Sequence, residues 1–119
     1  MEKEITEGEI VKQICHWLAV HGHFFWRCNN IPVYGRSLPK YTPRGLPDIF
    51  VLECGMLYGL EVKRPAQNGI RENNGRVLRE GKLSLEQAEW GILMRDNGGV
   101  YACVRSLDDV KALLHFPSF

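Results

Sequence analysis

Three charged residues interrupt the most apolar part of the chain, the stretch GLPDIFVLECGMLYGLEVKRP at positions 45–65. Asp48 precedes the first apolar run, while Glu61 and Lys63 lie in the second. Carboxylates in an apolar setting resist desolvation, and a hard divalent cation relieves that cost by accepting their oxygens as ligands. The residue types therefore predict a divalent-metal site. The simpler alternative is a surface salt bridge between Lys63 and one of the two acids.

The spacing of these residues predicts how a hairpin would assemble them. If Cys54-Gly55 is a two-residue turn, Glu53 pairs with Met56, and Asp48 falls directly opposite Glu61 on one face of the hairpin. Lys63 shares that face with Glu61, because strand side chains alternate with period two. We expect the metal ligands to be Asp48, Glu61 and the backbone carbonyl of Val62. A three-residue turn would instead place Asp48 on the opposite face.

The spacing of apolar residues along the rest of the chain predicts an α/β protein with a central mixed sheet flanked by helices. A single domain would span residues 1–119. The expected helices cover 6–21, with Thr6 as N-cap, and the segments that Ser84 and Ser106 open. The expected strands cover 23–28, 48–53, 56–63 and 100–104. Residues 29–46 and 65–82 are expected to be irregular.

Two expectations concern which side chains enter the core. The helix after Ser84 is expected to turn four apolar residues inward: Leu85, Ala88, Ile92 and Leu93. The aromatic run Phe24, Phe25 and Trp26 could stack on nucleobases, but core packing is the expected role for such residues in a short strand.

Composition narrows the class of protein. No leader-like segment and no apolar run of about 20 residues occurs, so neither secretion nor a membrane span is expected. The four cysteines show no zinc-ligand spacing, and reduced, buried thiols in a cytoplasmic protein are the expectation.

The net charge of +1 conceals two basic segments on either side of the Asp48–Glu61 region. Such a pattern would attract a polyanion to the flanks and a cation to the middle. The alternative is that the basic residues only keep surface loops solvated and bind nothing. The candidate phosphate-contacting residues are Arg27, Arg36, Lys40, Arg44, Arg64, Arg76 and Arg79.

Four sequence blocks resemble the VRR-NUC family of the PD-(D/E)XK nucleases. Pro47-Asp48 and Glu61-Val62-Lys63 match the superfamily signature, and Arg44 to Asp48 (RGLPD) resembles the family's RGxPD segment. The first helix carries Glu7-x-x-Ile10-x-x-x-Ile14, and Lys82 to Gln87 (KLSLEQ) resembles the KLSxxQ segment. The resemblance covers about residues 6–104. The chain departs from the family's pattern in the long interval between Lys63 and Ser84.

The resemblance implies a restriction-endonuclease-like αβββαβ core and a metal-dependent DNA endonuclease. Asp48 and Glu61 would hold Mg²⁺ or Mn²⁺ with Glu7, while Lys63 would act on the attacking water and the scissile phosphate. Gln87 would hydrogen-bond the phosphate or that water. Glu7 is preferred to Glu9 as the N-terminal acid, because Glu9 is explained by capping at Thr6 and Glu7 lies on the core side of the helix.

The resemblance also implies a substrate and a context. Stand-alone, phage-type members resemble Holliday-junction resolvases and act as homodimers on branched DNA, in a bacterial cell or a phage-infected host. A different class of function stays open: a non-catalytic nucleic-acid-binding module that kept the nuclease fold. A metal-stabilised interaction protein is a third possibility.

Overall fold

The architecture is a mixed sheet with helices on both faces. The computed structural model describes residues 5–28, 45–71, 77–78 and 81–114, with the backbone alone described at 67–71 and 77–78. The elements in chain order are α1 (Glu7–Val20), β1 (Phe24–Arg27), β2 (Ile49–Glu53), β3 (Met56–Val62), β4 (Gln67–Arg71), β5 (Val77–Leu78), α2 (Leu85–Asp96), β6 (Val100–Val104) and α3 (Leu107–Leu113). The four-stranded sheet has the order β1-β2-β3-β6. Strands β3 and β6 are parallel and the other pairs are antiparallel, which confirms the predicted α/β class with a mixed sheet.

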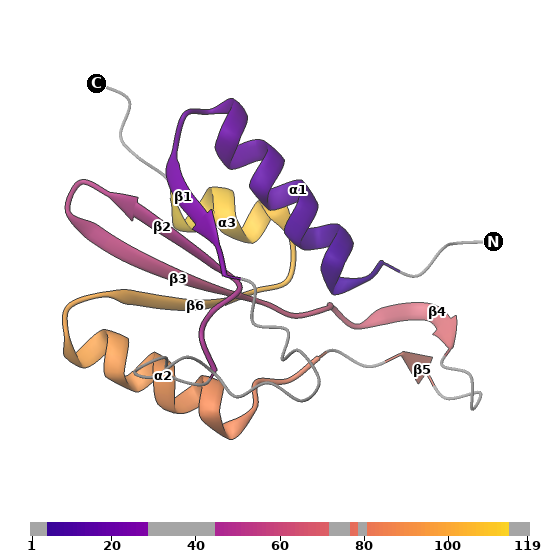
Figure 1. Ribbon diagram of the computed structural model, residues 1–119. Coiled ribbons are helices and arrows are strands. Elements are labelled where there is room, and N and C mark those ends of the chain that lie inside the picture. Colours follow the sequence, from indigo (N-terminus) through magenta and orange to yellow (C-terminus); the bar gives the residue numbers. More distant parts are fainter. Residues whose placement is uncertain (1–4, 29–44, 72–76, 79–80, 115–119) are drawn as a thin grey trace, which may run out of the picture.

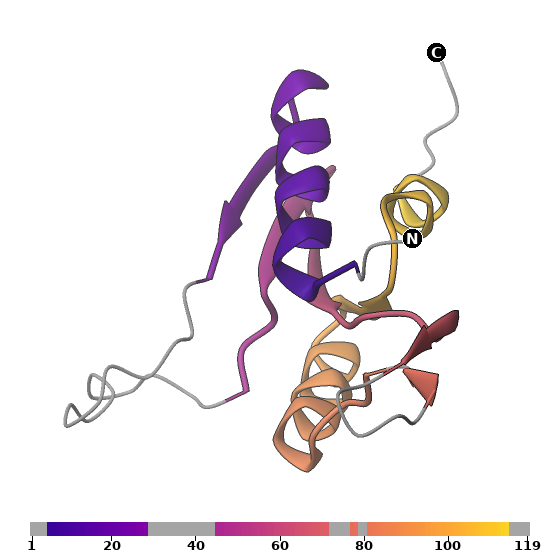
Figure 2. The same cartoon turned by 90° about the vertical axis from the view of Figure 1, so that its right-hand side faces the viewer.

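Helices α1 and α3 cover one face of the sheet and α2 covers the other (Figures 1 and 2). The larger hydrophobic core lies under α1 and α3 and contains Ile14, Leu18, Val51 and Leu60 among its buried residues. A smaller core on the α2 face contains Phe50, Met94 and Tyr101. No helix in the described ranges is long and apolar enough to cross a membrane.

Helix α1 begins and ends where its sequence predicts. The Thr6 hydroxyl accepts a hydrogen bond from the Glu9 backbone N–H at 3.2 Å, which satisfies one of the free donors of the first turn. Ile10, Ile14 and Leu18 recur at helical spacing and are buried. Gly22 follows with a φ of 71°, a conformation that favours glycine at a helix end.

The predicted hairpin register is confirmed. Glu53 pairs with Met56 and Ile49 with Leu60, so Cys54 and Gly55 form a two-residue turn. Both turn residues have positive φ, 49° and 78°, as a type I′ turn requires. All four cysteines are free thiols, as expected, but none is fully buried: Cys54 is exposed in the turn, and the others, Cys15, Cys28 and Cys103, are half-buried.

The inner face predicted for α2 is wrong. Three of the four residues expected to be buried are instead largely exposed: Leu85 (76%), Ile92 (56%) and Leu93 (58%). Ala88 is half-buried, and the buried positions of this helix are Gly91 and Met94.

A close approach between α2 and the sheet explains this orientation. A Cβ atom added at Gly91 would lie 2.8 Å from Cδ1 of Tyr101, so the absent side chain lets the Tyr101 ring pack under the helix. Gln87 lies one turn before Gly91 and also faces the sheet, where it contacts Glu61. The helix therefore turns inward a glycine and a polar side chain, which an apolar-periodicity argument does not select.

Two further expectations are corrected. Part of 65–82 forms the antiparallel pair β4–β5, because backbone pairing does not require the alternating apolar pattern that the segment lacks. Phe24 and Trp26 are exposed, at 66% and 42%, and of the three aromatic residues in the run Phe25 alone packs against the larger core. Strand β1 lies at the edge of the sheet, and its side chains alternate between the two faces. Phe25 therefore faces the larger core, while Phe24 and Trp26 face the other side.

Candidate active site

The candidate site lies at the open end of the β2–β3 hairpin, on the face that α2 covers. Asp48 immediately precedes β2, Glu61 lies in β3, and Lys63 follows β3. Extending the observed register by one residue sets Asp48 opposite Glu61, as the sequence predicts.

Asp48 is held against the neighbouring strand. Its Oδ2 atom accepts a hydrogen bond of 2.7 Å from the Val62 backbone N–H. The Cys28 backbone N–H donates to the Asp48 carbonyl oxygen at 2.8 Å, which connects the residue to the end of β1 as well. The Val62 bond thus holds the carboxylate, and the Cys28 bond holds the backbone that carries it.

Glu61 is the charged residue most removed from solvent in the described chain, with 3% of its surface exposed. Its Oε1 atom accepts a hydrogen bond of 2.7 Å from Nε2 of Gln87 and lies 3.6 Å from Nζ of Lys63. Its Oε2 atom is buried and has no hydrogen-bond partner in the described part of the chain. A buried carboxylate oxygen without a partner is costly, so this atom is an available acceptor that points to a ligand.

The electrostatic environment disfavours two negative charges here. Burial and then the Asp48 carboxylate together raise the pKa of Glu61 to about 8, while Lys63 opposes the shift. Burial also raises the pKa of Asp48, against the lowering effects of the Val62 hydrogen bond and of Lys63. Two carboxylates share one nearby ammonium group, so a bound cation would stabilise the fully ionised pair.

Gln87 connects the site to the start of α2. Its Oε1 atom accepts from the Ser84 backbone N–H at 2.8 Å, and the Ser84 hydroxyl accepts from the Gln87 backbone N–H at 3.2 Å. This capping box directs Nε2 toward Glu61. The contact of Gln87 with phosphate or water stays a prediction. The contact that the structure shows is with the Glu61 carboxylate, which this hydrogen bond positions.

Glu7 approaches the site from α1. Its Oε1 atom accepts from the Arg64 backbone N–H at 3.3 Å, and its charge raises the pKa of Asp48 as the smallest of several effects. Across the part of the chain that the structure describes, no three His, Cys, Asp or Glu side chains lie close enough together to form a metal-binding group. The structure therefore brings Asp48 and Glu61 together and places Glu7 nearby, outside such a group. Glu9 supplies its backbone N–H to the Thr6 cap.

Two residues that sequence patterns do not select also belong to this neighbourhood. Nη1 of Arg105 donates to the carbonyl oxygens of Arg64 at 2.9 Å and Gly81 at 2.7 Å, while the Gly81 N–H donates to the same Arg64 oxygen at 3.0 Å. These bonds close the base of the β4–β5 excursion beside Lys63. The Tyr101 hydroxyl is buried and finds no hydrogen-bond partner within the described ranges, and burial, followed by the charge of Glu61, raises its pKa. A lone arginine or tyrosine in an ordinary strand context carries no sequence signal for these roles.

Two of the seven predicted phosphate-contacting residues lie in the described ranges. Arg27 is exposed at the end of β1, and Arg64 is half-buried directly after Lys63. Five of the predicted contacts lie outside the described residues: Arg36, Lys40, Arg44, Arg76 and Arg79.

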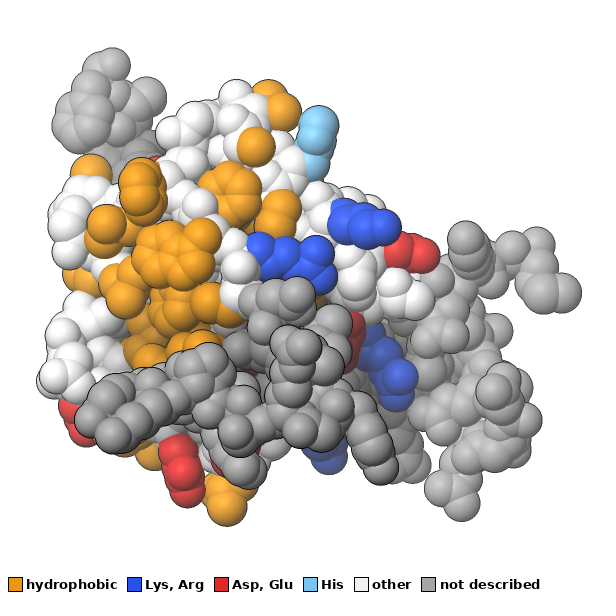
Figure 3. Space-filling view, in the orientation of Figure 1, with side chains coloured by type: hydrophobic (Ala, Val, Ile, Leu, Met, Phe, Trp, Pro, Cys, Tyr) orange, Lys and Arg blue, Asp and Glu red, His pale blue; other side chains and the backbone are white. Residues whose placement is uncertain are grey.

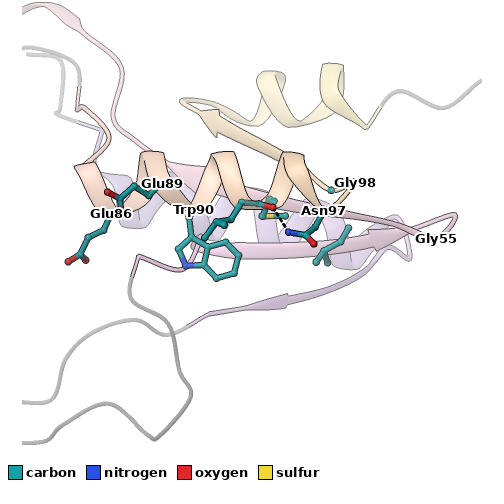
Figure 4. A pocket seen from close by; sticks show the side chains of 10 residues that line it. Gly55, Glu86, Glu89, Trp90, Asn97 and Gly98 are labelled. Carbon is teal, nitrogen blue, oxygen red and sulfur yellow. Dashed lines mark hydrogen bonds between the residues drawn. The ribbon is translucent and has the colours of Figure 1, made fainter.

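A pocket of about 750 Å³ lies elsewhere, between α2 and the hairpin (Figure 4). Its walls include Leu57, Trp90, Leu93 and Met94, and Figure 4 shows Glu86 and Glu89 on the same helix. None of Asp48, Glu61 and Lys63 lines it, so this mainly apolar pocket is separate from the carboxylate pair.

Comparisons with known proteins bear on the fold. No protein-family model matches the chain, and a search of curated proteins finds no match. Among solved structures, one described as "VRR_NUC domain" superposes with a TM-score of 0.58 at 21% sequence identity. The similarity covers 93% of this chain and 97% of that one. The chain thus has the fold of a VRR-NUC domain over nearly its whole length.

Proposed function

We propose that this protein is a divalent-metal-dependent nuclease that hydrolyses phosphodiester bonds in DNA. The observation that carries the proposal is the pair of half-buried Asp48 and buried Glu61, in which Oε2 of Glu61 has no hydrogen-bond partner among the described residues while Lys63 lies alongside. The shared fold with a structure described as a VRR_NUC domain supports the same conclusion.

The residues fit a hard cation. Asp48 and Glu61 would supply carboxylate oxygens, which Mg²⁺ and Mn²⁺ prefer, and the Val62 carbonyl would add a neutral oxygen. Glu7 would act through a bridging water, since it lies outside a direct group with the other two acids. When bound, such a cation lowers the pKa of a coordinated water and polarises the phosphoryl oxygen.

The chain's own residues would orient and stabilise the reacting groups. Lys63 would hold the attacking water and donate a hydrogen bond to the scissile phosphate, where negative charge grows in the transition state. Gln87 would keep Glu61 in its ligating orientation through the 2.7 Å bond to Oε1. Water attacks phosphorus and the bond to the 3′ oxygen breaks, which leaves a 5′-phosphate and a 3′-hydroxyl.

The finer proposal concerns substrate and assembly. We propose that the enzyme acts on branched DNA, including four-way junctions, as a homodimer that presents two active sites. The predicted basic residues on both sides of the site would contact phosphates and make binding salt-dependent. Arg27 and Arg64 are the two of these that lie in the described ranges.

Cleavage of defined DNA structures tests the proposal. Labelled single-stranded, duplex, flap and four-way-junction DNA should be incubated with the protein in Mg²⁺, in Mn²⁺ and in chelator. We expect cleavage with metal and none in chelator, and its loss in Asp48→Asn and Lys63→Met. Lys111→Met is the matched control, because Lys111 is an exposed lysine on α3, outside the site.

Two results would contradict the assignment. Cleavage by Lys63→Met or Asp48→Asn at the rate of the unmodified protein would remove these residues from the mechanism. DNA binding without metal-dependent cleavage would instead identify a nucleic-acid-binding module that retains the fold.

A further inference from the structure

Four aromatic rings form a continuous line across the α2 face of the sheet. We call Phe24, Trp26, Phe50 and Trp90 the aromatic ladder. Successive ring centroids are 6.1 Å apart for Phe24 and Trp26, 5.3 Å for Trp26 and Phe50, and 6.4 Å for Phe50 and Trp90. The ladder joins the edge strand β1, the neighbouring strand β2 and helix α2.

The outer rings of the ladder are open to solvent. Phe24 is 66% exposed and Trp26 is 42% exposed, whereas Phe50 beneath them is 6% exposed. Figure 3 shows hydrophobic side chains gathered over the β1 side of the sheet, where these rings lie. Because Phe50 is fixed in the smaller core and contacts Trp26, the ladder presents flat aromatic surfaces that are held in place.

The ladder begins beside the carboxylate pair. Trp26 pairs with Phe50 and Phe24 pairs with Leu52, and these positions share the face of Asp48. At about 3.4 Å of rise per residue, Trp26 lies about 7 Å and Phe24 about 14 Å along the strands from the level of Asp48. A chain of nucleotides with a phosphate at Asp48 would therefore have its next bases over these rings.

The charges along this face favour one direction for such a chain. Lys63 lies at the Asp48 end of this face, where its Nζ is 3.6 Å from Oε1 of Glu61. Arg27 is exposed at the same end of β1 but points to the opposite face, because it neighbours Trp26 in the strand. The phosphates are thus favoured at the Asp48 end, with the bases over β1.

We propose that Phe24 and Trp26 bind unpaired nucleobases of a single-stranded segment next to the scissile phosphate. Every base has a π face, so stacking on exposed aromatic rings is strong and tolerant of sequence, and an open sheet face is a known platform for it. A paired duplex keeps its bases stacked inside the helix and cannot use these rings. The inference rests on the proposed function and deepens it, because it selects DNA with an unpaired strand at the cleavage point.

Binding in chelator tests the inference separately from catalysis. Fluorescence anisotropy should compare a labelled oligothymidylate with a duplex for the unmodified protein, Phe24→Ala and Trp26→Ala. Each substitution should lower single-strand affinity about tenfold and leave duplex affinity within about twofold. Trp26→Phe keeps a ring and should stay within about threefold of the unmodified protein.

Leu52→Ala is the matched control. Leu52 is 41% exposed, pairs with Phe24 on the same face and is apolar but has no ring. It should leave single-strand affinity unchanged. An equal loss in Leu52→Ala, or equal losses for single strands and duplex, would overturn the proposal, because general apolar contact or lost folding would then explain the effect.

A second copy of the chain is the competing occupant of this face. Sedimentation of the same variants decides between the two. If Trp26→Ala and Phe24→Ala convert a dimer to a monomer while single-strand affinity is retained, the rings form a subunit interface and the proposal is wrong. Metal-dependent cleavage of a flap substrate is measured in parallel, so that failure of the nuclease function is seen independently of failure of base stacking.

Discussion

At one end of the β2–β3 hairpin Asp48 faces Glu61, and at the other end Glu53 faces His23, which immediately precedes β1. Nδ1 of His23 contacts Oε1 of Glu53, and the His23 imidazole stacks on Trp17 with ring centroids 5.1 Å apart. The single carboxylate at the turn end, Glu53, therefore has an imidazole beside it. At the open end two acids share the ammonium group of Lys63, which lies 3.6 Å from Glu61.

The two ends therefore differ in role: Glu53 supports folding, whereas Asp48 and Glu61 form a candidate ligand site. A contact between one acid and one imidazole can balance the charge within the protein, although Oε2 of Glu53, like Oε2 of Glu61, is buried with no hydrogen-bond partner among the described residues. A pair of buried acids with one ammonium group leaves surplus negative charge, which low-dielectric surroundings make costly. Both ends belong to the same two strands, so the chemical identity of the cross-strand partner, and not the fold, makes the distinction.

Replacing Glu61 at the open end should have the largest effect on metal affinity and cleavage. Glu61→Gln keeps the size of the side chain but replaces a ligating oxygen, so we expect metal affinity and cleavage to fall at least about 100-fold. The same change should raise the free energy of unfolding in chelator near neutral pH, because a neutral amide is not charged in the unfolded chain and need not take up a proton on burial. Calorimetric Mn²⁺ titration and urea unfolding measure the two effects. A variant that loses stability without losing metal affinity would contradict the comparison.

The stability of the metal-free protein should depend on pH in an unusual direction. The pKa of Glu61 rises from 4.5 to about 8 on folding, so between these values the folded chain holds a proton that the unfolded chain has released. The free energy of unfolding should therefore decrease as pH rises from about 4.5 to about 8. Asp48 shifts in the same direction and adds to the trend.

Urea unfolding in chelator at several pH values measures this slope. Glu61→Gln should flatten it, since the titrating group is gone, while Asp48 retains a residual slope. Saturating Mg²⁺ should raise stability most at the alkaline end, where the pair is ionised. A stability that rises steadily across this pH range in the metal-free protein would show that the two carboxyl groups are not buried together.

Substitution of Gln87 tests whether the orientation of the Glu61 carboxylate matters for metal affinity. Gln87→Met has similar length but can neither donate to Glu61 nor accept from Ser84, so we expect metal affinity to fall about tenfold. Glu86→Gln is a control in the same helix turn, because Glu86 is exposed. Equal effects of the two substitutions would indicate that the capping of α2, or its charge, is what matters.

The site was predictable from sequence where local rules govern it. The Cys54-Gly55 turn determines the register, and period-two alternation then places Asp48, Glu61 and Lys63 on one face. The inner face of α2 was not predictable in that way. Gly91 permits the close approach of Tyr101, and Gln87 turns inward to reach Glu61, so the helix orientation depends on contacts between segments distant in sequence.

The exposed aromatic rings illustrate the same limit. An FFW run is expected to be buried, and the exposure of Phe24 and Trp26 follows from the place of β1 at the sheet edge. Likewise, the contacts of Arg105 with Arg64 and Gly81 join parts of the chain that no spacing rule relates. Tertiary neighbours, and not local propensity, decide these features.

The smallest effect on function should come from the turn end. Glu53→Gln removes the charge that faces His23 and leaves a buried amide where Oε2 now lies, so we expect a loss of about 1 kcal/mol in the free energy of unfolding. Metal affinity and cleavage should stay within about twofold, because the whole length of β2 separates Glu53 from Asp48. Unfolding and cleavage measured on the same preparation check both statements. If Glu53→Gln reduced cleavage as strongly as Glu61→Gln at equal folded fraction, the two ends would not be functionally distinct. The role of the open end would then have to be extended along the entire hairpin.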